Sequence, residues 1–547
     1  MRCLAAFITL TLAGALAGCK ADSVTAPTPV SALWITADVD TITVGDSLPL
    51  YATATDGEGR PMSAPSLRWS SSDSMVAGVD AATGRVAARS AGVVMISTNV
   101  GATRAYLELT VLGAPVFSSV VAGWVHSCAV AADGRVYCAG WNGYGELGIG
   151  VPGDDPILGD RNPFLVRVIG EQRVRSASAY GLHSCALTRS GEVYCWGLGD
   201  MGQLGVQNQG YCEADRRRGV VTPCLPAPGK IASSDHFQAI ATAIDASCAL
   251  RTDGRAFCWG INERGELGSS GYYRWGLPIP VDGDFVFATI AGGRNHMCAT
   301  TLDQRAFCWG SNWRGQLGTD AVPTCVAQGD GCYAFRPYAV LGGHAFAALA
   351  PGGFHTCGLT TTQEVYCWGD NSLGQLGDGT AIGSLLPRRV GTGHYTSVVS
   401  GDLHSCALDS DGRAWCWGMN DDGQLGAPSA DTCYDYEAPY PCSTAPAPAQ
   451  TAHRFRNLAL GMYHSCGVTS AGEVRCWGWN DYGQLGNGSD VGGMASTAMR
   501  TAPPSTVARV AAPTMTLDAV GVPTSRHRLR DGPWRDLHPS RRGTGMR

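Results

Sequence analysis

Short apolar runs alternate with polar turns along most of this chain, and one arrangement of them recurs. In residues 184–197, an apolar run around Leu187 and a second one around Val193 flank the turn Ser190-Gly191. Two such runs separated by roughly three to five turn residues predict a β-hairpin. The pattern begins at seven cysteines spaced 49 to 63 residues apart, and every copy ends in Gly-(Gln/Glu)-Leu-Gly. Repetition at this period indicates a solenoid, a propeller or another array.

Each copy holds two cysteines ten residues apart, and the hairpin places them on facing strands. Pairing about Ser190 sets Cys185 opposite Cys195, and in a non-hydrogen-bonded pair the Cα atoms lie about 4.5 Å apart, which a disulfide can bridge. The alternatives are reduced cysteines packed as small apolar residues, or a zinc site, which requires closer cysteine pairs and converging ligands. We expect these disulfides: Cys128 with Cys138, Cys185 with Cys195, Cys248 with Cys258, Cys298 with Cys308, Cys357 with Cys367, Cys406 with Cys416, and Cys466 with Cys476.

A glycine and a histidine precede the first cysteine of most copies. Glycine stands five residues before it in five copies and predicts close backbone approach in a crowded strand. Histidine stands two residues before it in six copies, whereas the third copy has Ala243 and Ala246 in the two places. A ring of histidines suggests metal binding or acid–base chemistry. A residue repeated in each unit more often fixes a hydrogen bond within that unit, and we expect this structural role.

The pattern Gly-x-x-His-Ser-Cys-Ala-Leu, followed by Gly-x-Val-Tyr-Cys-Trp-Gly-x-Asn-x-x-Gly-Gln-Leu-Gly, resembles the regulator-of-chromosome-condensation repeat. The resemblance implies an all-β, seven-bladed β-propeller, which we assign to residues 114–510. The paired cysteines depart from the eukaryotic pattern and suggest an extracytoplasmic bacterial branch. We expect one terminus to supply a strand that completes the terminal blade, because an unpaired edge invites aggregation.

The first residues predict export. Residues 1–18 combine a short positive start with an apolar run from Leu4 to Leu16, which fits a lipoprotein signal peptide better than a membrane-spanning helix. The sequence Leu-Ala-Gly before Cys19 resembles the lipobox at which bacterial lipoproteins are cleaved and lipidated on cysteine; a plain signal peptide is the alternative. Lys20 resembles the residue found in cargo sent to the outer membrane. We expect a lipid anchor at Cys19, at the outer membrane or cell surface, and no other membrane contact.

The remaining cysteines agree with an oxidising compartment. With Cys3 and Cys19 set aside, six cysteines lie outside the repeats, in three insertions between repeats. An even number in an exported chain favours complete pairing. We expect Cys212 to pair with Cys224, Cys325 with Cys332, and Cys433 with Cys442.

The segment between the anchor and the repeats has two parts. Residues 19–31 are rich in Ala, Ser, Thr and Pro and predict a flexible stalk. Residues 32–113 lack cysteine and alternate short apolar strands with turns, which predicts a small β-sandwich. Residues 67–73 and 79–86 resemble the bacterial immunoglobulin-like domain of group 2, in which we expect Trp69 to be a core aromatic. We expect this domain to serve as a spacer rather than as an adhesive module.

Charge and motifs exclude several function classes. The net charge is −6, which leaves no basic face suited to nucleic acid. Residues 511–547 predict a disordered basic tail, which is either solvated or touches an anionic surface. Phosphate loops, dinucleotide fingerprints and hydrolase motifs are absent from the sequence. The Asp-rich stretches 409–412 and 420–423 faintly resemble calcium loops but occupy ordinary repeat turns. We expect no catalytic residue, no metal and no cofactor.

Aromatic side chains at variable positions of the repeat are the candidate binding residues. They stand just before or within the turn Gly-(Gln/Glu)-Leu-Gly, and isolated aromatics on polar loops are typical of protein interfaces. Packing between neighbouring blades is the alternative. The candidates are Trp141, Tyr144, Trp313, Trp479 and Tyr482.

Our first hypothesis is a cell-surface lipoprotein whose propeller binds an envelope or extracellular protein or glycan. Three alternatives come from the family and the fold. Secreted relatives include a β-lactamase inhibitor, which suggests inhibition of a β-lactamase-like cell-wall serine enzyme. The nuclear founder of the family is a guanine-nucleotide exchange factor, an activity that would need a GTPase outside the cytoplasm. An enzyme with its site in the blade insertions is the third, because a fold does not imply a function.

Overall fold

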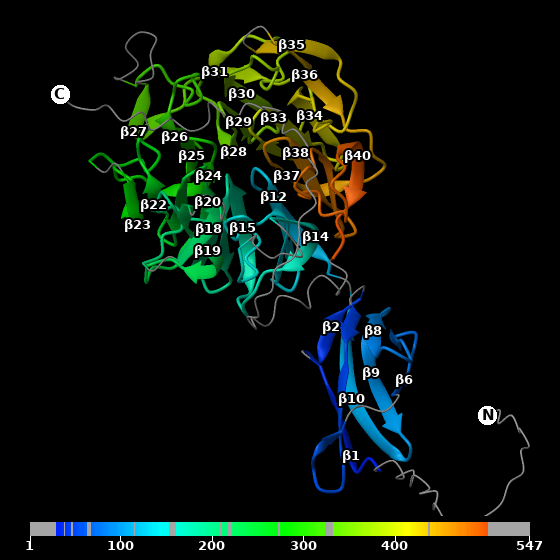
Figure 1. Ribbon diagram of the computed structural model, residues 1–547. Coiled ribbons are helices and arrows are strands. Elements are labelled where there is room, and N and C mark those ends of the chain that lie inside the picture. Colours follow the sequence, from blue (N-terminus) through cyan, green and yellow to red (C-terminus); the bar gives the residue numbers. More distant parts are fainter. Residues whose placement is uncertain are drawn as a thin grey trace, which may run out of the picture. The chain divides into compact units, whose positions relative to one another are not determined.

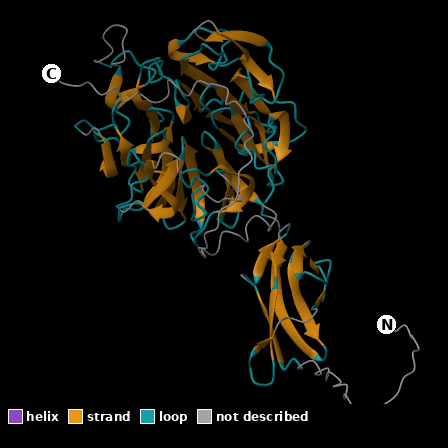
Figure 2. Cartoon of the chain, viewed as in Figure 1, coloured by secondary structure: helices purple, strands orange, loops and turns teal. Residues whose placement is uncertain are grey.

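The computed structural model describes residues 29–501, except 38, 45–46, 63–66, 114, 153–159, 208–209, 216–219, 272–273, 323–331 and 436–437. Every regular element in this part of the chain is a β-strand (Figure 2), so the all-β prediction is confirmed. The described residues contain no helix with the length and apolar character needed to cross a bilayer. The predicted signal peptide, the lipidation site Cys19 and the tail 511–547 lie outside the described residues.

Ten short strands lie in residues 32–112 and form three sheets, ordered β1-β4-β5, β2-β10-β9-β6 and β3-β8-β7. Their bounds are β1 Ala32–Thr36, β2 Thr41–Thr43, β3 Ser47–Pro49, β4 Tyr51–Thr55, β5 Pro61–Met62, β6 Arg68–Ser71, β7 Ala77–Val79, β8 Arg85–Ala88, β9 Gly92–Val100 and β10 Thr103–Leu112. Side chains from seven of these strands meet in one core, and Trp69 is buried there with Val86, Ile96 and Leu109. Trp69 is therefore a core residue, as its sequence context predicts.

From residue 117 onward the described strands form seven antiparallel sheets, one for each sequence repeat. Each sheet is built from consecutive strands, because every repeat supplies its own hairpins. The first three sheets comprise β11 Phe117–Ala122, β12 His126–Ala131, β13 Val136–Trp141 and β14 Arg161–Arg167; β15 Val174–Tyr180, β16 His183–Thr188, β17 Val193–Leu198, β18 Gly210–Asp215 and β19 Val220–Lys230; and β20 Phe237–Thr242, β21 Ala246–Arg251, β22 Ala256–Ile261 and β23 Arg274–Pro280.

The other four sheets follow the same plan. They comprise β24 Phe287–Gly292, β25 His296–Thr301, β26 Ala306–Ser311 and β27 Tyr333–Ala339; β28 Phe346–Pro351, β29 His355–Thr360, β30 Val365–Gly369 and β31 Ser384–Arg389; β32 Ser397–Ser400, β33 His404–Leu408, β34 Ala414–Met419, β35 Asp431–Asp435 and β36 Ala438–Pro448; and β37 Phe455–Leu460, β38 His464–Thr469, β39 Val474–Gly478 and β40 Gly493–Ala498. The insertions of the second and sixth repeats add a fifth strand, β18 and β35, at the outer edge of their sheets.

Disulfides join the second and third strands of every one of these sheets. The register pairs Cys185 directly with Cys195, and in all seven repeat disulfides the Cα atoms lie 4.0 to 4.1 Å apart. Two insertion disulfides, Cys212–Cys224 and Cys433–Cys442, link the outermost strands. Cys332 is also disulfide-bonded, and Cys325 lies outside the described residues.

The innermost strands of the seven sheets form a closed ring. Each contacts the next in sequence order, and β37 contacts β11, so the last sheet packs against the first (Figure 1). At this contact Phe117 N donates to Gly472 O at 2.9 Å, and Leu165 N donates to Arg500 O at 2.8 Å. Leu165 of the first sheet also forms an isolated parallel bridge with Thr501, the last described residue, so the expected terminal strand after Thr501 stays a prediction. In the described residues, the ring closes where the last sheet packs side by side against the first.

Contacts between neighbouring repeats explain why a histidine recurs at the same position of six repeats. Six histidines are fully buried, and each places Nε2 2.8 to 2.9 Å from a serine or threonine hydroxyl of the next repeat, as His404 does with Ser465. The predicted bond within each repeat is therefore wrong. In four cases that hydroxyl donates to a backbone carbonyl, as Ser465 does to Gln424 O at 2.7 Å, so the histidine must donate through Nε2–H.

The predicted close approach at glycine is also present at these contacts between repeats. A Cβ atom on Gly461 would lie 2.2 Å from Cε1 of His464 and 2.5 Å from the carbonyl oxygen of Gly123. Glycine is therefore needed where a buried imidazole and the next repeat's backbone meet.

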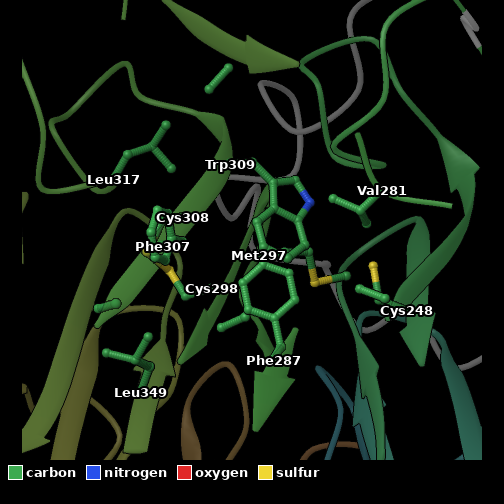
Figure 3. Packing of buried hydrophobic residues seen from close by; sticks show 14 of the residues in the cluster. Cys248, Val281, Phe287, Met297, Cys298, Phe307, Cys308, Trp309, Leu317 and Leu349 are labelled. Atoms are coloured by element: carbon green, nitrogen blue, oxygen red, sulfur yellow. A yellow bond between two sulfur atoms is a disulfide. The ribbon is translucent and has the colours of Figure 1, made fainter. Parts of the chain in front are cut away.

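The contact between the third and fourth repeats has a different chemistry. Ala246 replaces the histidine and Met297 replaces the hydroxyl residue. Both are fully buried, and Met297 packs in one apolar cluster with Cys248, Phe287 and Trp309 (Figure 3). The Trp309 indole still donates to Glu266 O at 3.1 Å, as five other tryptophans do at the equivalent contacts.

Candidate binding face

Two sets of connections emerge at the same end of each sheet. The first set joins the first strand to the second and comprises residues 123–125, 181–182, 243–245, 293–295, 352–354, 401–403 and 461–463. The second set joins the third strand to the outer strands and begins with the repeat's Asn-x-x-Gly-(Gln/Glu)-Leu-Gly turn. Backbone bonds join the two sets, as from Trp479 N to Tyr463 O at 2.9 Å. We call this end of the ring the loop face.

Each turn of the second set is rigid for reasons visible in the repeat. Asn480 Oδ1 accepts from Leu485 N at 2.9 Å, and Gln484 Oε1 accepts from Tyr482 N at 3.1 Å. Gly483 has a φ of +76°, and a Cβ atom there would lie 2.6 Å from Cα of Pro163 in the first repeat. The asparagine, glutamine and glycine therefore hold the turn, and the variable positions between them are free to present different side chains.

Three of the five predicted binding residues lie together on the loop face. Trp141 of the first repeat and Tyr482 of the seventh have ring centroids 5.1 Å apart, and Tyr482 lies 5.2 Å from Trp479. Tyr463, which the sequence did not single out, extends the row at 5.8 Å from Trp479. All four rings are half-buried and meet edge to face. The row thus packs between two repeats and still presents aromatic surface to solvent.

The other two predicted residues stand apart from this row. Trp313 of the fourth repeat is 47% exposed, lies 6.1 Å from Phe354 and carries the Arg314 guanidinium 4.7 Å above its ring. Tyr144 is half-buried, and burial is the main cause that raises the pKa of its phenol, with Glu146 and Asp200 adding to it. The structure therefore joins Trp141, Trp479 and Tyr482 in one surface but not Tyr144 or Trp313.

Residues of the first set of connections, together with Tyr180 at the end of β15, meet across the ring in an axial cluster that the sequence analysis missed. Tyr180 of the second repeat donates a hydrogen bond to Asp402 of the sixth, and Arg294 of the fourth lies 3.8 Å from the same carboxylate. The Arg294 guanidinium also lies 5.6 Å from the Trp124 ring and 5.1 Å from the Phe354 ring. The sequence offers one signal for these residues. They lie between the end of the first strand and the recurring histidine of each repeat, at positions whose residue changes from copy to copy.

A surface pocket of about 610 Å³ lies between the sixth and seventh repeats on this face. Trp479 and Met494 line it together with Asp421, Asp422 and Asp481. Burial raises the pKa of Asp422 to about 6, and the negative charges of Asp421 and Asp481 add to the effect. The pocket therefore joins one end of the aromatic row to a concentration of negative charge.

The same geometry argues against chemistry at the histidines. Burial lowers the pKa of His126 to about 4 and of the other five histidines to about 3, so all six are neutral at pH 7. They are fully buried and bonded to the neighbouring repeat, which leaves them out of reach of a substrate. Within the part of the chain that the structure describes, no three His, Cys, Asp or Glu side chains are placed to hold a metal ion.

Comparison with known proteins gives the following matches. Residues 153–515 match the family described as RCC1-like domain, and residues 117–146 match the regulator of chromosome condensation (RCC1) repeat. The human E3 ubiquitin-protein ligase HERC2 is 28% identical over 282 residues, which cover 50% of this chain and 5% of HERC2. The ultraviolet-B receptor UVR8 of Arabidopsis thaliana is 31% identical over 131 residues, which cover 24% of this chain and 27% of UVR8. This chain thus spans only a small part of these relatives.

The fold is shared with a solved yeast structure. Yeast RCC1 (Prp20), solved bound to Kap60, superposes with a TM-score of 0.58 at 22% identity, over 67% of this chain and 84% of the yeast chain. This likeness concerns the β-propeller fold alone.

Proposed function

This chain belongs to the RCC1-like domain family, and we infer from that premise that it is a non-enzymatic binding module whose loop face recognises a protein. The single observation that carries the proposal is the aromatic row Trp141–Tyr482–Trp479–Tyr463 on rigid turns. Half-buried aromatic rings held in fixed rotamers supply contact area at low entropic cost. A protein partner is favoured over a glycan because neighbouring rings of the row are nearly perpendicular and so form no flat platform on which a sugar could stack.

The proposal extends to architecture and location. We propose residues 1–18 as a lipoprotein signal peptide, Cys19 as the lipidated residue, 19–31 as a stalk, 32–113 as an immunoglobulin-like spacer, 114–510 as a seven-bladed propeller and 511–547 as a basic tail. The support is the sequence of the first residues and the many disulfides, which persist in oxidising compartments. Replacing Cys19 with Ser is expected to release the protein from the membrane fraction; membrane retention of the variant would contradict the anchor.

The relatives support binding more directly than they support any reaction. The yeast structure is a complex of Kap60 with RCC1, so a protein that contains this fold takes part in a protein complex. HERC2 is a ubiquitin ligase, but this chain matches only 5% of it, so its ligase activity supports nothing for this chain. Nucleotide exchange has no feature in its favour here beyond the family name.

The test is affinity capture with matched variants. Immobilised protein is expected to capture a defined envelope protein, and Trp141→Ala or Tyr482→Ala is expected to weaken that binding at least tenfold. Leu302→Ala is the control, because Leu302 is exposed in the hairpin turn at the opposite end of the sheets. If both aromatic variants bind every captured protein as tightly as the unsubstituted chain, the loop face is not the binding surface.

A further inference from the structure

We propose that the pocket between the sixth and seventh repeats holds a lysine or arginine side chain of the protein partner. The proposal rests on the proposed function, because it assigns the chemistry of one position on the same loop face. It concerns the pocket lined by Asp421, Asp422, Asp481, Trp479 and Met494.

The carboxylates of the pocket have no cation of their own among the described residues. Asp421 and Asp422 come from the turn of the sixth repeat, Asp481 from that of the seventh, and none of the three carboxylates belongs to an ion pair in the described part of the chain. One neighbouring basic residue, Arg161, donates to the Asp481 carbonyl and lies 3.4 Å from Asp490 Oδ2, so it is already engaged. Three carboxylates placed together without a counter-charge favour a cation supplied from outside.

The uncharged wall of the pocket suits a long cationic side chain. Trp479 offers an indole ring, whose face attracts a guanidinium or ammonium group electrostatically. Met494 is 47% exposed and offers apolar surface to the methylene stem of such a side chain. The volume of about 610 Å³ falls within the range of roughly 300–1,000 Å³ that is typical of ligand pockets.

The same face already contains a filled site of this composition. In the axial cluster, the Arg294 guanidinium lies against Trp124 and Phe354 and 3.8 Å from the Asp402 carboxylate. The pocket between the sixth and seventh repeats also combines carboxylates with an aromatic ring, but no guanidinium group of the described residues lines it. The axial cluster thus shows that a carboxylate and aromatic rings on this face can hold an arginine side chain. A metal ion fits less well, since no group of three potential ligands in the described residues is arranged to hold one.

The test uses short peptides and the full chain. Titration calorimetry with acetyl-Gly-Gly-Arg-Gly-Gly-amide and its lysine analogue at millimolar concentration is expected to show binding, and the glutamine analogue none. Asp422→Asn and Trp479→Ala are each expected to weaken binding at least tenfold, whereas Asp284→Asn is expected to have no effect. Asp284 is the matched control because it is exposed between β23 and β24, at the opposite end of the sheets. Equal binding of the glutamine peptide, or full binding by Asp422→Asn, would overturn the proposal.

Two further arms separate the possible failures. If the captured partner tolerates Asn at 421, 422 and 481 together but not Trp141→Ala, the loop face binds a protein and the pocket assignment is wrong. If the partner tolerates both variants, the proposed function fails as well. If the arginine peptide binds only after the tail arginines are changed to glutamine, the occupant is the chain's own basic tail, and the partner assignment is wrong.

Discussion

Six contacts between neighbouring repeats are polar, and the contact between the third and fourth repeats is apolar. In the polar type, a histidine bonds to a hydroxyl of the next repeat, as His355 does to Ser405 at 2.8 Å. In the apolar type, Ala246 and Met297 occupy the two places. Both types keep the same strand arrangement, and Trp309 at the apolar contact donates to the preceding turn as a tryptophan does at five of the six polar contacts. The strand arrangement therefore accepts either type, and at the apolar contact the histidine and the hydroxyl are replaced together.

The largest expected difference between the two types is their response to acid. A buried neutral histidine has a folded pKa below its unfolded value of about 6.5, so its contribution is complete above pH 6.5 and is lost as the pH falls toward about 4 or 3. At pH 4.5 each histidine costs about 2 to 3 kcal/mol. Six such groups together match or exceed the whole stability of a typical domain, about 5–15 kcal/mol. We expect the protein to unfold near pH 4.5, and circular dichroism measured against pH detects this transition.

Hydrogen exchange locates this acid effect. Amides beside His355 and His404 are expected to lose protection between pH 6.5 and 5 before amides beside Ala246 do, after correction for intrinsic exchange. Uniform loss around the ring, or earliest loss at Ala246, would contradict a role for the histidines.

A second prediction converts the apolar contact into the polar type. Ala246→His alone is expected to destabilise the protein by about 2–4 kcal/mol, because a buried imidazole would face Met297 and Ala243 without an acceptor. Adding Met297→Ser and Ala243→Gly is expected to recover at least half of the loss. Thermal and denaturant unfolding measure both. A triple variant no more stable than Ala246→His would show that backbone differences, and not the missing pair, set this contact apart.

A third prediction concerns the turn beneath each contact, where Glu146 and Glu266 replace the glutamine of the other five repeats. Both are fully buried, and burial raises the pKa of Glu146 to about 8 and of Glu266 to about 7. A raised carboxyl pKa means that stability is lost as the pH rises from about 4.5 through the folded value. Glu146→Gln removes that loss and is expected to stabilise the protein by about 4 kcal/mol at pH 8.

The pH series provides the control for the glutamate substitution. At pH 6, well above the expected acid unfolding, the same pKa shift predicts a smaller gain of about 2 kcal/mol in the free energy of unfolding, measured by denaturant unfolding. An equal gain at both pH values would mean that packing, and not ionisation, explains the effect.

The smallest expected effect comes from removing one hydroxyl. Ser465→Ala deletes the acceptor of His404 Nε2–H and one donor to Gln424 O, while Trp477 still donates to that oxygen at 2.9 Å. We expect a loss of about 1–2 kcal/mol. Ser70→Ala, at an exposed serine in β6, is the control and is expected to change stability by less than about 0.5 kcal/mol. A loss no larger than that of the control would show that the histidine–hydroxyl bond contributes nothing.

Much of the fold is predictable because it repeats. The ten-residue cysteine spacing places Cys185 opposite Cys195, and hairpin pairing is a local property that needs no knowledge of the rest of the chain.

The candidate site is only partly predictable. Trp141, Trp479 and Tyr482 are visible as aromatic residues at variable positions, but the contact of Trp141 with Tyr482 joins the first and last repeats, 341 residues apart in the numbering.

The axial cluster shows the limit of sequence reasoning most clearly. Tyr180, Arg294 and Asp402 come from three repeats that are not neighbours, and no spacing in the sequence relates them. Only the curvature of the assembled ring brings these side chains together at the axis. The partner of each histidine was missed for a related reason: a repeated pattern does not distinguish a bond within a unit from one to the next unit.

The sequence by itself determined the strands, the disulfide within each hairpin and the rigid turns, because all of these depend on residues close together in the chain. Tertiary structure alone decided which repeats touch, that the last sheet packs against the first, and that an aromatic row ends beside three carboxylates with no ion-pair partner among the described residues. The physical reason is distance along the chain: local geometry follows from spacing, whereas contacts across the ring depend on the small rotation between successive sheets.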